Sequence, residues 1–159
     1  MKKIVIIISL LVFSFELDAQ VSLKGIELGK ENYDQRSSWT TVAEHTGSLT
    51  MERTDDKRVY QVKFYTESDY PENKGLKKDF KTSVEANYKI KLENITEEES
   101  KLGDPMGSGY IQYVGEAFNN GCRFELRLWG NQYISFYITD IELFNVYISE
   151  QKAQISTDF

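Results

Sequence analysis

The segment Arg123–Thr139, RFELRLWGNQYISFYIT, constrains the fold of this chain more than any other stretch. Large apolar residues alternate with polar or aromatic ones on both sides of Gly130–Gln132, which is typical of two strands joined by a tight loop. A loop at Gly130–Gln132 puts every large aliphatic side chain on one face, whereas a two-residue loop would divide them between both faces. The sequence therefore predicts an antiparallel hairpin with one buried face. The predicted inward residues are Phe124, Leu126, Leu128, Ile134, Phe136 and Ile138.

The outward face of this hairpin is the strongest candidate for a binding surface. Trp, Tyr and Arg are enriched at the energetic centres of protein interfaces, and aromatic rings can also stack on sugars. A sheet in a two-layer domain is covered by helices on one face and can leave the other face open. Alternatively, the N-terminal segment or a C-terminal helix covers this face, or its aromatic rings only shield the sheet. The candidate ligand-binding residues are Trp129, Tyr133, Tyr137, Arg123 and Arg127.

A second hairpin precedes the first one in the sequence. Asn120–Gly121 fits a type I′ turn, which needs positive φ at both central residues, and joins YIQYVGEAF to CRFELRLW. With this turn, Phe124 pairs with Ala117, and Tyr113 faces inward. The same register puts Glu116 opposite Glu125 on the outward face.

The rest of the chain predicts further strands and at least one helix. TGSLTMERTDDKRVYQVKFYTE reads as a hairpin with its turn at Asp55–Lys57. Residues 30–45 are weakly patterned and could form a loop, a short helix or an edge strand. A helix is expected over about residues 71–88, because Leu76, Phe80, Val84 and Tyr88 recur every four residues while Lys77, Lys78, Lys81 and Glu85 lie off that stripe. After Thr139, a capping box to Glu142 favours a C-terminal helix over a continued strand.

These elements predict an α+β fold. We expect a two-layer domain over residues 20–159, with an antiparallel sheet of about five to six strands. The main helix, over about residues 71–88, and a possible C-terminal helix are expected to pack on one face of that sheet. No repeat, low-complexity tract or Pro/Gly-rich linker divides the chain, so a single domain is expected.

Residues 1–19 have the plan of a secretory signal peptide. Lys2 and Lys3 precede an apolar run from Ile4 to Phe15, and a polar segment then ends in the small residue Ala19. The apolar run is shorter than the about 20 residues that a membrane-spanning helix needs, although an uncleaved anchor is the alternative. We expect cleavage before Gln20 and export to the periplasm or the extracellular space.

Composition restricts the partners. The full chain has a formal net charge of -6, and removing residues 1–19 leaves it unchanged because two lysines and two acids leave together. An acidic protein is poorly suited to nucleic acid or to an anionic membrane surface, since phosphate binding depends on clustered Lys and Arg. Partners are therefore expected to be proteins or glycans, with no membrane span in the mature chain.

Few catalytic constellations are available. His45 and Cys122 are the only histidine and the only cysteine, which removes zinc sets, disulfides and most triads. A Cys122–His45 pair is conceivable, but a small strand residue after a turn explains Cys122 more simply. Glu116 and Glu125 could act as an acid and a base, although Arg123 and Arg127 beside them would lower their pKa values. No cofactor, metal or catalytic residue is predicted.

The signal ending in DAQ, the LKGIELG opening and the order of strands, lysine-rich helix and strands resemble small, uncharacterised secreted proteins of Bacteroidota. The resemblance implies a bacterial protein exported across the inner membrane with a two-layer α+β domain, and it brings no known active site. Taken together, the sequence predicts an exported, non-catalytic binding protein that uses the aromatic and arginine-bearing sheet face. A small secreted hydrolase with a carboxylate-based site is the alternative.

Overall fold

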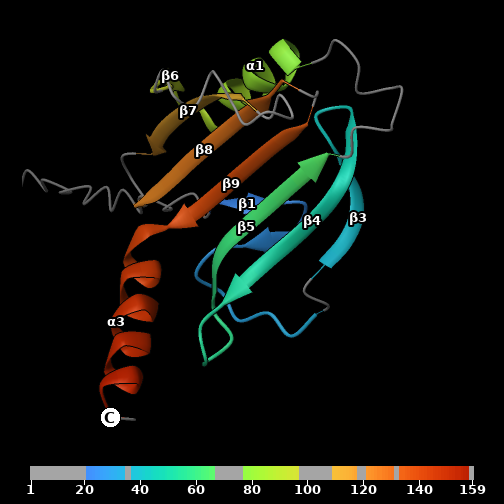
Figure 1. Ribbon diagram of the computed structural model, residues 1–159. Coiled ribbons are helices and arrows are strands. Elements are labelled where there is room, and N and C mark those ends of the chain that lie inside the picture. Colours follow the sequence, from blue (N-terminus) through green and yellow to red (C-terminus); the bar gives the residue numbers. More distant parts are fainter. Residues whose placement is uncertain are drawn as a thin grey trace, which may run out of the picture.

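The computed structural model describes residues 21–34, 37–66, 77–96, 109–117, 121–130 and 133–157. Figure 1 shows the arrangement of its helices and strands. In chain order they are β1 (Ser22–Leu23), β2 (Ile26–Glu27), β3 (Ser37–Val42), β4 (His45–Arg53), β5 (Val59–Thr66), α1 (Lys77–Tyr88), β6 (Glu93–Asn94), β7 (Tyr110–Ala117), β8 (Cys122–Trp129), β9 (Ile134–Asp140) and α3 (Ile141–Thr157). The predicted signal peptide and residues 71–76 of the predicted helix lie outside the described residues.

The described chain is mostly β, so the predicted α+β fold class is wrong. Seven strands form one antiparallel sheet in the order β3-β4-β5-β9-β8-β7-β6, and β1 and β2 form a separate two-stranded sheet. The prediction failed for two reasons. Residues 37–42, for which an edge strand was one of three open alternatives, form the edge strand β3, and α3 does not add to the helical layer.

The β8–β9 hairpin has the predicted register. Leu128 pairs with Ile134, and the Trp129 N–H donates to the Tyr133 carbonyl at 3.0 Å. Leu128 itself is half-buried. The other five predicted inward residues are fully buried: Phe124, Leu126, Ile134, Phe136 and Ile138.

The register predicted for β7–β8 is wrong by two residues. Phe124 pairs with Gly115 rather than Ala117, so residues 118–121 connect the strands, of which 118–120 lie outside the described residues. A Cβ atom at Gly115 would come within 2.7 Å of the Lys91 carbonyl oxygen, so a larger residue would not fit there. This register places a glycine where the backbone at Lys91 passes closely over β7. A shift of two residues keeps every side chain on its predicted face.

The core lies on the inner face of the seven-stranded sheet. Helix α1 and the β1–β2 sheet both pack against this face, and β1 and β2 pass behind the sheet in Figure 1. Phe80 of α1 is fully buried, with its ring centroid 6.0 Å from that of Phe64 and 5.7 Å from that of Phe136. The Tyr88 hydroxyl donates to the Ser22 carbonyl at 2.8 Å and so joins α1 to β1.

The predicted apolar stripe of α1 is confirmed for its described members, since Phe80 and Val84 are buried and Tyr88 packs against the core. Lys81 lies off this stripe, as predicted, but it is half-buried and paired. Its side chain is only 24% exposed, its Nζ lies 2.6 Å from Glu85 Oε1, and the same Nζ lies 5.3 Å from the centroid of the Tyr113 ring.

Helix α3 confirms the predicted C-terminal helix but corrects its start and its position. The Leu143 N–H donates to Asp140 Oδ1 at 3.0 Å, so Asp140 caps the helix while Thr139 remains in β9. The helix does not pack on one face of the sheet. Only its beginning contacts the sheet, where the Tyr147 ring stacks 4.9 Å from Tyr60, and the rest projects away from the end of β9 (Figure 1).

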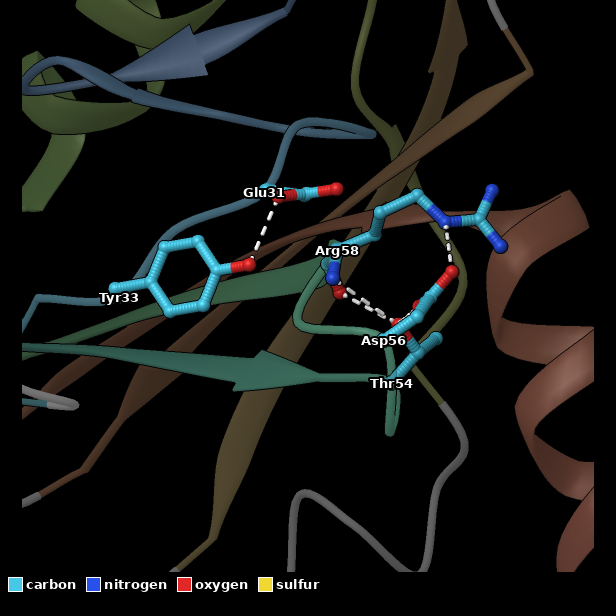
Figure 2. Close-up of polar contacts among 5 residues, drawn as sticks. All are labelled: Glu31, Tyr33, Thr54, Asp56 and Arg58. Carbon is cyan, nitrogen blue, oxygen red and sulfur yellow. Dashed lines mark hydrogen bonds and ion pairs between the residues drawn. The ribbon is translucent and has the colours of Figure 1, made fainter.

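The β4–β5 hairpin was predicted correctly, and its turn is held by side chains. The Thr54 hydroxyl donates to Asp56 Oδ1 and accepts the Arg58 N–H at 3.1 Å, while Arg58 Nε donates to Asp56 Oδ2 at 2.7 Å (Figure 2). Beside this turn, Glu31 forms a β-bridge with Arg58 and accepts a hydrogen bond from Tyr33 at 2.9 Å.

Candidate functional site

The side of the seven-stranded sheet opposite α1, β1 and β2 is the candidate functional site, and we call it the open face. Pairing across the strands aligns its side chains in rows, because Arg127 pairs with Ser135 and Ser135 with Tyr65. No described element lies across it, since α3 projects from one end of the sheet (Figure 1). The C-terminal helix therefore does not cover this face. The described part of the N-terminal segment, residues 21–34, does not cover it either, because β1 and β2 pack on the inner face.

Arg127 lies between two aromatic rings on the open face. Its guanidinium carbon lies 5.1 Å from the centroid of the Tyr110 ring and 5.7 Å from that of Tyr137. Its Nη2 lies 2.6 Å from Glu125 Oε1, and its side chain is 31% exposed. Aromatic faces attract a guanidinium through their quadrupole, and the carboxylate attracts it as well. The cation is thus held in one orientation while part of it remains accessible.

Trp129 extends this cluster toward the end of β8. Its indole Nε1–H donates to Ser135 Oγ at 2.9 Å, and its ring centroid lies 4.7 Å from that of Tyr110. Ser135 is buried although it belongs to the open face, while Trp129 is half-buried. The indole therefore lies over the sheet, with its polar atom satisfied and part of its surface exposed.

Tyr65 was not among the predicted site residues, yet it belongs to the cluster. Its ring meets that of Tyr137 edge-on at 5.7 Å. Burial, followed by the hydrogen bond with Tyr137, raises the pKa of Tyr65 well above its ordinary value. The alternation of β5 contained the signal, because a strand that turns Val62 and Phe64 inward must turn Tyr65 outward.

The structure brings together three of the five predicted residues, Arg127, Trp129 and Tyr137. Tyr133 is half-buried beside them and accepts the Trp129 N–H through its carbonyl at 3.0 Å. Arg123 lies on the same face but four residues from Arg127 along β8, about 13 Å away, where it pairs with Thr139 and Glu116. Arg123 is therefore outside the aromatic cluster.

The two candidate carboxylates do not form a pair. Glu116 lies opposite Arg123, and Glu125 lies opposite Val114 and beside Arg127. The predicted Glu116–Glu125 pairing is wrong because the β7–β8 register is shifted by two residues. The shift also replaces a repulsive cross-strand pair with one of opposite charge, which favours the observed register.

The conceivable Cys122–His45 pair is excluded by geometry. Cys122 pairs with Asp140 at the C-terminal end of β9. His45 lies near Gly47, which pairs with Thr66, and Thr66 bonds to Ile134 at the N-terminal end of β9. The two side chains are therefore about 20 Å apart along the strands. Burial, together with the negative charge of Asp140, raises the pKa of the Cys122 thiol to about 11. A thiol with that pKa is a poor nucleophile at neutral pH.

His45 is buried in the core. Its Nδ1 lies 2.6 Å from the Ala43 carbonyl oxygen, and its ring meets that of Phe80 edge-on at 5.3 Å. Among the described residues, no group of three or more His, Cys, Asp or Glu side chains is arranged to hold a metal ion. Neither described helix combines the length and the apolar character that crossing a membrane requires.

Comparison with known proteins gives no relative from which a role could be transferred: no family model, curated protein or solved structure matches this chain. The arrangement itself defines the available chemistry. A surface with a fixed guanidinium between aromatic rings can stack on planar groups or sugar rings, and it can donate hydrogen bonds to carboxylates, hydroxyls or carbonyls.

Proposed function

We propose that this chain is an exported, non-catalytic binding protein whose ligand docks on the open face. The observation that supports the proposal most is the position of Arg127, with its guanidinium between the rings of Tyr110 and Tyr137 on a face that no described element covers. Trp129 widens this platform. Interfaces concentrate their binding energy in such clusters of Trp, Tyr and Arg.

The ligand is a protein or a glycan. Both offer groups that a guanidinium can hydrogen-bond, and both offer surfaces that aromatic rings can cover. The formal net charge of -6 argues against nucleic acid as the ligand. The plan of residues 1–19 supports export, so the ligand is expected in the periplasm or outside the cell.

Capture from two separate sources tests this function. The mature chain is immobilised and exposed first to envelope proteins and then to envelope polysaccharide that has been freed of protein. Arg127→Ala removes the central guanidinium, and Asn87→Ala, an exposed change on α1 behind the sheet, is the control.

We expect the native chain and Asn87→Ala to retain the same ligand from one source, and Arg127→Ala to lose about 2 kcal/mol or more of binding free energy. Thermal melting of each variant gives the folded fraction, to which capture is normalised. Equal capture by all three proteins would contradict a binding role for the open face.

A further inference from the structure

Charges of opposite sign alternate along the open face. On β8, Arg123, Glu125 and Arg127 occupy every second position and therefore lie on the same face, about 7 Å from one to the next. Glu125 and Arg127 pair with each other, but both side chains remain partly exposed. The strand thus presents a base, an acid and a base to a docking molecule.

The neighbouring strands also mix the two signs. Glu116 of β7 is exposed and lies opposite Arg123. On β4 and β5, Lys63 Nζ lies 2.8 Å from Glu52 Oε1, and both of these side chains are partly exposed. The open face therefore interleaves acids and bases instead of gathering one sign of charge.

Arg123 and Arg127 each keep a hydrogen-bond donor that the fold leaves without an acceptor. The Nε atom of each arginine is buried and has no hydrogen-bond partner among the described residues. An unpaired buried donor costs free energy, and a carboxylate in contact with the guanidinium offsets part of that cost. A partner that brings acids to these two positions would therefore bind more tightly than one that does not.

The packing of the aromatic rings favours a protein over a glycan as that partner. Arg127 lies over the rings of Tyr110 and Tyr137. Trp129 packs on Tyr110, Tyr65 meets Tyr137 edge-on, and all four rings are half-buried. Sugars bind aromatic side chains by stacking on an open ring face. These rings instead pack against the guanidinium and against each other.

The charge pattern gives the same preference. A carboxylated polysaccharide carries one sign of charge, so it would meet acids as well as bases on this face, in a chain whose formal net charge is -6. A neutral glycan would cover the charged groups without pairing them. A protein surface offers both signs, and complementary charges determine the specificity and register of protein interfaces.

We propose that the partner on the open face is a protein that docks an extended segment along β8, with an acid, a base and an acid at alternate positions facing Arg123, Glu125 and Arg127. An extended segment has the same two-residue spacing as β8, so the three contacts form together. Strands of stacked sheets run within about 30° of each other, which permits this alignment. The inference rests on the proposed function, because it specifies the ligand of the same face.

Two peptides with blocked ends test the pattern: TETKTET has the proposed order of charges, and TKTETKT has the signs reversed. Each is added to the mature chain up to about 10 mM, while NMR follows the Nε–H signals of Arg123 and Arg127. TETKTET should shift both signals, and TKTETKT should bind about tenfold more weakly or worse. Arg123→Gln should weaken binding of TETKTET by a similar factor. Lys152→Gln, the same loss of charge on an exposed position of α3, should leave it unchanged.

Polygalacturonate and dextran, a charged and an uncharged polysaccharide, are titrated in the same way. Shifts of the arginine signals with either polysaccharide but not with TETKTET would overturn the inference and leave the proposed function standing. No shift with TETKTET at about 10 mM, or equal affinity for the two peptides, would overturn it as well. Signals that shift with the concentration of the chain itself would assign the face to a second copy and so contradict it. Equal capture by the native chain and Arg127→Ala, in contrast, would remove the proposed function.

Discussion

Phe80 joins α1 to the sheet, and replacing it tests which face of α1 is buried. Its ring contacts His45, Phe64 and Phe136 and is fully buried. Phe80→Ala should lower the free energy of unfolding by about 3 to 5 kcal/mol, as other large-to-small core changes do. Denaturant melts measure it.

The control for Phe80 is Asn87→Ala, because its neighbour in sequence, Lys81, is half-buried and paired with Glu85. Asn87 is exposed, so its replacement should change the free energy of unfolding by less than about 0.5 kcal/mol. Equal losses in the two variants would mean that α1 presents a different face to the sheet.

Asp56 makes the β4–β5 turn sensitive to acid. The hydrogen bond from Thr54, followed by the contacts with Arg58, holds the pKa of this carboxyl below its ordinary value. A carboxyl whose pKa is lower in the folded state stabilises the fold above its unfolded pKa, and that contribution is lost as pH falls through the folded pKa. The stability advantage of the native chain over Asp56→Asn should therefore be present at neutral pH and shrink below about pH 4. A stability difference between the native chain and Asp56→Asn that stays constant or grows as pH falls would refute this role of Asp56.

At the scale of elements, the β8–β9 register could be predicted because large aliphatic side chains occupy every second position on both strands. The β7–β8 register could not, because the Asn119-Asn120-Gly121 signal gives the place of the turn but not the number of loop residues. Moving the pairing by two residues changes no face, so alternation alone does not separate the two registers. The close approach of Lys91 to Gly115, a tertiary contact, favours the observed one.

β3 was only one of three alternatives for residues 30–45, for a different reason. Serine and threonine occupy most of its positions, so the contrast between apolar and polar residues that marks a half-buried strand is weak. Its turn uses Ala43 and Glu44 with positive φ, where glycine or asparagine is usual, so the sequence carries no turn signal. Three residues of the aromatic cluster were foreseen because the register of β8 and β9 was correct, and Tyr65 was overlooked although its strand was predicted.

The start of α3 gives a prediction at the same scale. Asp140 accepts the Leu143 N–H and lies at the positive end of the helix dipole. Asp140→Ala should cost about 1 kcal/mol of stability and reduce helical circular dichroism. Glu142→Ala, which would break the capping box predicted from Thr139, should cost less than about 0.5 kcal/mol. A larger loss of stability in Glu142→Ala than in Asp140→Ala would mean that Thr139 caps the helix.

At the scale of the whole molecule, the proposed export predicts the first residue of the mature protein. Cleavage after Ala19 should yield a chain that begins at Gln20, because the lysines, the apolar run and the small residue before the cut follow the plan of a signal peptide. Intact-mass measurement of protein recovered from the periplasm or the medium checks this. Exported protein that retains Lys2 and Lys3 would disprove it.

The open face combines side chains from four strands, because β5, β7, β8 and β9 each contribute to the cluster around Arg127. A cluster of this kind can serve the sheet itself or a ligand. Trp129 separates the two roles, because its hydrogen bond to Ser135 stabilises the fold while its side chain remains partly exposed.

The most direct measurement is therefore a paired one on Trp129→Ala and Tyr133→Ala, combining thermal melting with ligand capture per folded molecule. We expect Trp129→Ala to lose about 1 kcal/mol of stability with its hydrogen bond, and Tyr133→Ala to lose less. Capture should weaken by about 2 kcal/mol or more in both variants. A large loss of stability with unchanged capture per folded molecule would contradict the account, because the face would then only support the sheet.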